Sequence, residues 1–344
     1  MGETAGKPLG LGVVGIGGWG RNVLRAFSQT SGAAVVRICD SGREQLAAAA
    51  AGCPGARPAD NYVEVLADEG VDAVALATPA PLHAEMARAA LSAGKHVYVE
   101  KPMCLNVADA RELVELAGQK DLRLMVGHLL EYHPAVGLLK ELIDGGEIGD
   151  VRYMYCERIN LGVVRKEENA LWSLAPHDIS IILYLFGAEP ESVSARGSCY
   201  LQEGVEDVVF SNLRFGDGRM AEIHNSWLDP NKERRMVVVG SKKMVVFDDM
   251  SATEKIRIYD KGAEVKRGTA DEIQAISVRH GEIRIPLVPG GEPLKVEAQH
   301  FVDCVRSGDT PRSDGIDGLN VVGVLEAATV SLMADGAPVR ISDL

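Results

Sequence analysis

The sequence predicts two domains: an α/β domain built on a parallel sheet, followed by an α+β domain built on a mainly antiparallel sheet. Three observations predict this. Short apolar runs alternate with segments of helix length through the first third of the chain. The first of these runs ends in a turn rich in glycine. From residue 191 onward, strand patterns follow one another with tight turns between them. Alternation indicates βαβ units, whereas consecutive strands indicate antiparallel pairing.

Length and composition are those of a folded protein with two sizeable cores. The chain has 344 residues, of which 46% are hydrophobic and 25% charged. This composition excludes a disordered chain. The formal net charge of −13 argues against a nucleic-acid-binding protein, because such proteins carry a basic face.

The cysteines and the N-terminal segment indicate a cytoplasmic protein. The six cysteines form no C-x-x-C pair and no zinc spacing, so we expect reduced thiols and no metal site. The first residues contain no apolar segment of the kind found in secretory signals. We see no apolar run long enough to span a bilayer, and therefore expect no membrane association.

The glycine-rich turn after the first strand has the spacing of a dinucleotide-binding motif. The strand Leu9–Val14 runs into Gly15, Gly17 and Gly20, which fit G-x-G-x-x-G, with Gly18 and Trp19 between them. Glycines at these positions allow the tight turn, the approach of a pyrophosphate and close packing of helix on strand. The helix N-terminus that follows favours a phosphate. The alternative is a tight strand–helix turn in another α/β protein.

An acidic residue at the end of the second strand indicates NAD. Asp40 follows the predicted strand 33–39 and lies twenty residues beyond Gly20, where a carboxylate that binds the ribose hydroxyls is expected. A carboxylate would repel the 2′-phosphate of NADP. The neighbouring Ser41 and Arg43 leave NADP open. The alternative role for Asp40 is to cap the next helix.

The later strands of the first third end in polar residues. Predicted strands 71–77, 96–99 and 122–126 end near Thr78, Glu100 and His128, at the edge of a parallel sheet where ligands bind. We expect Thr78, Pro79 and His83 to line the cofactor groove, although His83 alone fits a surface histidine equally well. Lys101 stands between Glu100 and Pro102 and can stabilise negative charge on a reacting oxygen. The alternative for Lys101 is a surface ion pair.

His177 is the strongest candidate for a general base. It precedes a predicted apolar helix, 179–186, whose N-terminus would disfavour the imidazolium and so suit a neutral base. We expect the adjacent Asp178 to cap this helix or to steady the site. The alternative is that His177 caps the helix or packs in the core.

The rest of the chain is predicted as one helix, a series of strands and two closing helices. The predicted helix covers 131–143, with Pro134 in its first turn, and the closing helices cover 296–306 and 318–333. Strands are predicted over 151–160, 192–200, 205–215, 219–227, 234–240, 243–248 and 255–259. Near one edge of this sheet, Arg158, Asn160 and Trp172 could hold substrate hydroxyls or a phosphate.

These motifs together resemble those of the Gfo/Idh/MocA family of sugar and polyol oxidoreductases. Segments that carry the resemblance are residues 15–20, 77–79 with His83, 94–97, 100–102, 172–179, 314–315 and 321–327. The resemblance implies a Rossmann domain over residues 1–128 and a C-terminal domain over 129–344 with a large open, mainly antiparallel sheet for substrate binding and oligomerisation. It implies that Lys101 is the family's lysine, which often precedes a cis peptide bond.

The resemblance also implies an activity: hydride transfer between NAD and a secondary alcohol of a sugar. Lys101 and His177 would be the reacting pair, because Ser173 replaces the acidic residue that many sugar and inositol members place four positions before the histidine. Residues 127–186, residues 227–230 and Arg234 look similar to members that act on C3 of nucleotide sugars, such as a UDP-N-acetylhexosamine.

Three alternatives to this activity stay open. They are a dehydrogenase of a free sugar or inositol, a redox-neutral NAD-dependent glycosidase, and a non-enzymatic ligand-binding protein. An uncovered open sheet would be prone to aggregate. We therefore expect a homodimer or homotetramer formed through the C-terminal sheet, in line with the family.

Overall fold

The computed structural model describes residues 7–162, 164–166, 168–266 and 275–344 and divides the chain into two compact units. The first unit combines residues 1–132 with 292–323, and the second combines residues 133–291 with 324–344. These units differ from the expected domains, 1–128 and 129–344, because residues 292–323 pack with the first unit. Each unit is described separately below.

The first unit contains a six-stranded parallel sheet in the order β3-β2-β1-β4-β5-β6. Its strands are β1 (Leu9–Val14), β2 (Ala33–Cys39), β3 (Arg57–Ala59), β4 (Ala73–Leu76), β5 (His96–Glu100) and β6 (Leu124–Gly127). Between them lie α1 (Gly20–Ser28), α2 (Arg43–Gly52), α3 (Tyr62–Ala67), η1 (Ala80–Leu82), α4 (His83–Ser92) and α5 (Val107–Gln119), and η2 (Leu129–Tyr132) follows β6. This order confirms the parallel sheet that the alternating pattern predicted, and β3 is a short addition to it.

Helix α8 (Pro293–Ser307) belongs to the first unit because it completes that unit's core. Phe301 of α8, Phe27 of α1 and Tyr98 of β5 meet edge to face, with ring centroids 5.3–6.0 Å apart. Such aromatic pairs add about 0.5–1.5 kcal/mol beyond the burial of their surface. The helix α9 (Gly315–Met333) runs from the first unit into the second.

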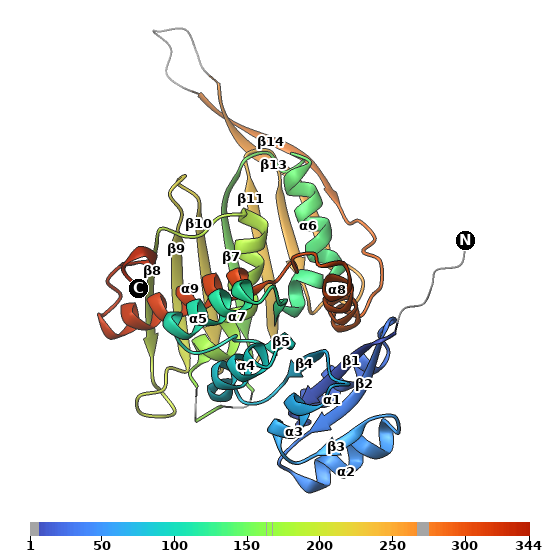
Figure 1. Cartoon of the computed structure of the whole chain (residues 1–344). Helices are drawn as coiled ribbons and strands as arrows, with labels where there is room; N and C mark the ends of the chain where they lie inside the picture. The colour runs from blue at the N-terminus through green and yellow to red at the C-terminus, as the bar shows by residue number, and fades with distance from the viewer. Residues whose placement is uncertain (1–6, 163, 167, 267–274) are drawn as a thin grey trace, which may run out of the picture. The chain divides into compact units, whose positions relative to one another are not determined.

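The second unit contains a nine-stranded sheet in the order β14-β13-β12-β11-β7-β10-β9-β8-β15. Its strands are β7 (Val151–Ile159), β8 (Ser192–Ser198), β9 (Val208–Arg214), β10 (Met220–Ser226), β11 (Glu233–Gly240), β12 (Met244–Asp248), β13 (Ile256–Lys266), β14 (Ala275–Arg284) and β15 (Val339–Arg340). All neighbours pair antiparallel except β7 and β10, which are parallel. Figure 1 shows the sheet with its strands side by side. The mainly antiparallel sheet is therefore confirmed, and β14 and β15 extend the predicted set.

The helices of the second unit are α6 (Pro134–Asp144), α7 (Ala170–Phe186) and η3 (Ile341–Asp343). The prediction that the helix around His177 begins near residue 179 is wrong. Helix α7 begins at Ala170, where the side chain of Asn169 accepts a hydrogen bond from the N–H of Trp172. Pro176 lies inside the helix and has no N–H to donate to the preceding turn. Because proline is common in the first turn of a helix, Pro176 led to the prediction that the helix starts close to it.

One face of the nine-stranded sheet carries exposed apolar side chains. On it, Tyr153 of β7 is 42% exposed and Phe210 of β9 is 48% exposed, and the ring of Phe210 stacks on His224 of β10. Large apolar residues gathered on one face often mark an interaction surface.

Helix α9 is the one helix in the described part of the chain with the length and apolar composition of a membrane span, contrary to the expectation that no such run exists. Half of its most apolar window is buried inside the structure. Core helices of soluble proteins have the same length and composition.

Candidate functional site

The glycine turn of the first unit has the geometry that a pyrophosphate requires. Gly15 has φ of +85°, and a Cβ there would lie 2.7 Å from the backbone of Ala77. A Cβ on Gly20 would overlap the carbonyl oxygen of Gly15, so helix α1 and strand β1 approach too closely for a side chain. At Gly17 and Gly18, by contrast, no atom lies within 4 Å of the Cβ position, and the backbone is open to a ligand.

Asp40 closes this turn from the end of β2. One carboxylate oxygen accepts the N–H of Ile16 at 2.5 Å, and the other accepts the N–H of Gly42 at 2.7 Å. The carboxylate therefore holds the glycine turn against β2, and its remaining lone pairs can accept from ribose hydroxyls. Ser41 follows as an exposed residue. These residues fit an NAD molecule.

Of the residues after β4 that were predicted to line the cofactor groove, His83 differs from that prediction because it is buried. Thr78 donates its hydroxyl to the sulfur of Met86 and stays partly exposed, and the Pro79 carbonyl accepts from Leu82. His83 is buried and spans two strand ends, with Nδ1 2.8 Å from the Pro102 carbonyl and Nε2 2.8 Å from the Thr78 carbonyl. Burial lowers its pKa, and the two carbonyls oppose that change. His83 acts as a brace between β4 and β5 rather than as a surface residue.

Glu100 and Lys101 lie at the end of β5, next to the glycine turn. The Nε1 of Trp19 donates to Oε1 of Glu100 at 2.6 Å, and the N–H of Lys101 donates to Oε2 at 3.3 Å. Burial raises the pKa of Glu100, while Trp19, the Lys101 ammonium and Tyr98 act in the opposite direction. The peptide bond between Lys101 and Pro102 is cis.

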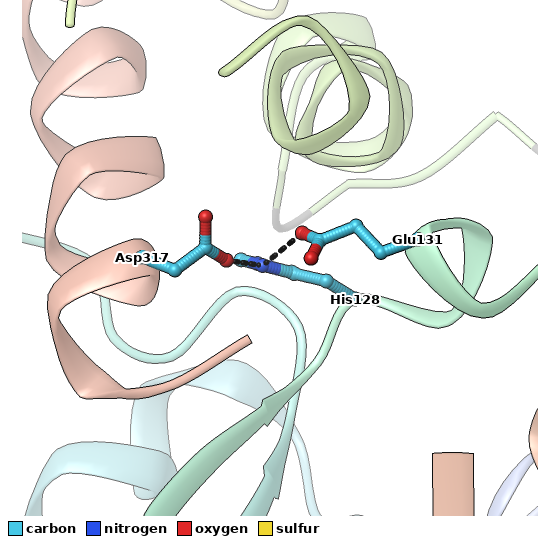
Figure 2. Close-up of side chains that lie close together, drawn as sticks. All are labelled: His128, Glu131 and Asp317. Carbon is cyan, nitrogen blue, oxygen red and sulfur yellow. Dashed lines mark hydrogen bonds and ion pairs between the residues drawn. The ribbon is translucent and has the colours of Figure 1, made fainter. Parts of the chain in front are cut away.

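A cluster of one histidine and two carboxyl groups lies beyond β6, and the spacing of these residues in the sequence did not predict it. His128 lies between the carboxylates of Asp317 on α9 and Glu131 on η2 (Figure 2). Its Nδ1 is 2.5 Å from Asp317 and 3.6 Å from Glu131. Burial opposes the charge on His128, but Asp317 raises its pKa to about 10. Burial raises the pKa of Glu131 to about 7. The fold thus assembles three groups of metal-ligand type, whose ligand atoms lie within 4.8 Å of one another.

In the second unit, His177 lies in the middle of α7 and not at its N-terminus. It is partly buried, and its carbonyl accepts the hydroxyl of Ser180 at 3.2 Å. It lies seven positions after Ala170, the first residue of the helix. The expectation that the helix N-terminus keeps His177 neutral is therefore wrong, because the dipole effect fades within the first turn.

Arg158 and Asp178 form a buried bidentate ion pair. Nε and Nη2 of Arg158 each donate at 2.9 Å to the carboxylate of Asp178. Arg158 lies on β7, a central strand, so the expected place near a sheet edge is wrong. Asp178 is occupied with Arg158 inside α7, and the expected helix cap is wrong as well. The pair fixes α7 to the sheet one residue after His177.

The other predicted substrate residues, Asn160 and Trp172, lie in the same unit. Asn160 follows β7, is partly exposed, and pairs its N–H with the Ser226 carbonyl. The indole N–H of Trp172 donates to Thr329 at 3.0 Å, which holds the ring against α9. Ser173 is buried on α7.

Comparison with known proteins places both parts of the chain in one family. Residues 9–128 match the model of the oxidoreductase family with an NAD-binding Rossmann fold, and residues 136–246 match the GFO/IDH/MocA C-terminal domain. An inositol 2-dehydrogenase of Mycolicibacterium vanbaalenii is 29% identical over 97% of this chain and 96% of its own length.

Two further relatives are named for different activities. UDP-N-acetylglucosamine 3-dehydrogenase of Acidithiobacillus ferrooxidans is 27% identical over 94% of this chain and 97% of its own. Its solved structure superposes with a TM-score of 0.81 over 95% of this chain and 98% of that one, at 25% identity. A 2,7-anhydro-N-acetylneuraminate hydratase of Mediterraneibacter gnavus is 25% identical over 84% of this chain and 81% of its own.

The glycine turn, Asp40 and the end of β5 thus all lie within residues 9–128, which match the NAD-binding Rossmann model, and residues 136–246 of the second unit match the C-terminal domain. The chain belongs to the Gfo/Idh/MocA family of oxidoreductases.

Proposed function

We propose that this protein is an NAD-dependent dehydrogenase that acts on a secondary alcohol of a sugar, at C3 of a nucleotide sugar of the UDP-N-acetylhexosamine type. The observation that carries the proposal is the similarity to UDP-N-acetylglucosamine 3-dehydrogenase, which extends over nearly the full length of both chains. Asp40 supports NAD over NADP, because its carboxylate would repel a 2′-phosphate.

The chemistry assigned to this chain's residues is proton handling and charge stabilisation. NAD, held by the glycine turn and Asp40, would supply the acceptor for the hydride of the carbinol carbon. His177 takes the proton of the substrate hydroxyl as general base. The ammonium of Lys101 stabilises the alkoxide-like oxygen as that proton leaves. The ketoreductase direction uses the same two groups with their roles reversed.

The substrate-binding residues are assigned from the second unit. Asn160 offers an amide to substrate hydroxyls, and Trp172 offers an aromatic face. We assign Arg158 a positioning role, because Asp178 already occupies its guanidinium. The exposed apolar face of the sheet, with Tyr153 and Phe210, supports a homodimer or homotetramer formed through that face. Size-exclusion chromatography with light scattering tests the assembly.

The test of the activity follows the absorbance of the nicotinamide when protein and NAD meet nucleotide sugars, free hexoses and inositols. A rise with UDP-N-acetylglucosamine or its uronic acid alone supports the proposal. A rise with free sugars or inositols keeps a dehydrogenase and rejects the nucleotide sugar. The same panel with NADP checks the cofactor preference.

A redox-neutral reaction is the second candidate, since one relative carries the name of a hydratase. In that reaction, transient oxidation of the sugar allows elimination or glycosidic cleavage with no net change in NAD. Product analysis by mass spectrometry detects it where absorbance stays constant.

A further inference from the structure

The hydroxyl of Tyr98 lies between two buried carboxyl groups of the first unit. Its oxygen is 3.0 Å from Oε2 of Glu297, on α8, and 3.1 Å from Oε1 of Glu100. Tyr98 is 1% exposed, Glu297 is fully buried, and Glu100 is 8% exposed. A phenol has one proton to donate, and an ionised carboxylate can only accept. Both contacts are hydrogen bonds only when one of the two carboxyl groups carries a proton.

The surroundings decide which carboxyl group that is. Glu100 accepts from the indole of Trp19 and from the N–H of Lys101, and the ammonium of Lys101 favours its ionised form. Glu297 has no such support: its second oxygen, Oε1, is buried and has no hydrogen-bond partner among the residues that the structure describes. An unpartnered buried carboxylate is far more costly than a buried neutral acid.

We propose that Glu297 is a neutral carboxylic acid that donates to Tyr98, that Tyr98 donates to ionised Glu100, and that Glu297 is thereby a positioning residue for the strand end that bears Lys101. The chain of hydrogen bonds continues from Glu100 to Trp19 of the glycine turn. Glu297 and Tyr98 donate in sequence toward Glu100, and Trp19 donates to Glu100 from the glycine turn, so the Glu100 carboxylate is the acceptor that joins the core to the turn.

The titratable groups around Glu297 agree with this assignment. Burial raises its pKa well above the ordinary value, and the charges of Glu100 and Glu131 act in the same direction. The hydrogen bond from Tyr98 and the charge of His128 oppose them. The role toward Lys101 rests on the proposed function, whereas the role toward the glycine turn rests only on the NAD-binding domain.

Infrared spectroscopy tests the protonation state directly. The full-length protein at about pH 9, above the pKa of Glu131, is expected to show the carbonyl stretch of a protonated carboxyl group. Glu297→Gln, which keeps the donor to Tyr98, should remove that band, and the control Glu131→Gln should keep it. Absence of the band in the native protein, or its persistence in Glu297→Gln, overturns the proposal.

The positioning role is tested by NADH binding across pH, followed by fluorescence. Glu297→Leu removes the donor to Tyr98, which weakens the donation from Tyr98 to Glu100 and raises the pKa of that carboxyl group. The acidic limb of NADH binding should move up by about one pH unit, a tenfold weaker affinity on that limb. Glu297→Gln should leave the limb in place, whereas equal shifts in both variants overturn the role.

Neither measurement needs the sugar substrate, so a failure here is distinct from a failure of the proposed dehydrogenase. Melting temperatures of the variants show whether each one folds. If Glu297→Leu does not fold, Tyr98→Phe replaces it, because it breaks the same chain at the middle link and retains the ring that packs on Phe27 and Phe301. An unmoved limb in Tyr98→Phe overturns the role equally.

Discussion

The indole N–H of Trp19 donates to the carboxylate of Glu100 at 2.6 Å, across 81 positions of the sequence. This bond ties the glycine turn after β1 to the end of β5. The ring itself is 45% exposed beside the open backbone of Gly17 and Gly18. Trp19 thus has a structural contact on one side and a free face on the other.

Replacing Trp19 with Phe should weaken NADH binding about tenfold, because a hydrogen bond to a charged acceptor contributes about 1.5–3 kcal/mol. Fluorescence or calorimetric titration with NADH measures the effect. Trp172→Phe serves as the control, since its indole N–H bonds Thr329 in the second unit. Equal affinities of Trp19→Phe and the native protein would show that the bond does not organise the turn.

Replacing Asp40 with Asn should change the cofactor preference. Removal of the negative charge abolishes the repulsion of a 2′-phosphate, and we expect the ratio of NAD to NADP affinity to fall by at least about tenfold. Asp72→Asn is the matched control, because Asp72 accepts the N–H of Gly10 at 2.7 Å at the other end of β1. A similar change of preference in both variants would argue against a direct role of Asp40.

Breaking the pair of Arg158 and Asp178 should be costly for folding. In Asp178→Asn a buried guanidinium loses its counter-charge, and we expect a loss of about 3–5 kcal/mol in the free energy of unfolding. The double variant with Met at 158 and Leu at 178 should recover much of this loss. Urea denaturation measures both, and Lys140→Met, which breaks the exposed pair with Asp144, should change stability little. A small effect of Asp178→Asn would mean that water reaches Arg158.

The cluster of His128, Glu131 and Asp317 should make the protein less stable as pH rises. Glu131 has an ordinary pKa of 4.5 and a folded pKa of about 7, so the folded state holds a proton that the unfolded state releases between these values. Stability should therefore fall by about 3 kcal/mol over this range. His128, whose pKa is raised from 6.5 to about 10, should lower stability further between those values.

Urea denaturation at several pH values separates the two groups. Glu131→Gln should flatten the slope between about pH 4.5 and 7 and keep the slope above it. Asp317→Asn should reduce the slope above about pH 6.5, because it removes the main source of the raised pKa of His128. A native protein with constant stability from pH 5 to 9 would contradict the assigned proton distribution.

The proposed reacting groups should be essential for turnover. Lys101→Met and His177→Gln should each lower kcat by about 10²–10⁴ at saturating NAD, because general acid–base catalysis contributes factors of this size. Steady-state absorbance with the substrate found by the panel provides the measurement. Lys95→Met and His224→Gln are the controls: Lys95 donates to the Val71 carbonyl, and His224 stacks on Phe210. Full turnover of either test variant with its cofactor bound would reject the assignment.

Local sequence patterns were enough to predict the cofactor-binding turn, the polar residues at the strand ends and most strands of both sheets. The spacing of Gly15, Gly17 and Gly20, the position of Asp40 and the polar residues at the strand ends are short-range features, because parallel strands direct their ends to one edge of a sheet. Period-two alternation placed the strands of the second unit in the same way.

Only the tertiary structure showed where α7 begins and which distant side chains become partners. The start of α7 could not be predicted from the sequence. A proline usually marks the first turn of a helix, but Pro176 lies inside α7, whose N-terminus is capped by Asn169. From the sequence, Arg158 is predicted to bind substrate. In the fold, α7 places Asp178 beside it and the two side chains form an ion pair. Tyr98 and Glu297 are 199 positions apart, and His128 and Asp317 are 189 apart. Such partners are selected by which elements pack together when apolar faces are buried, and no local spacing encodes that choice.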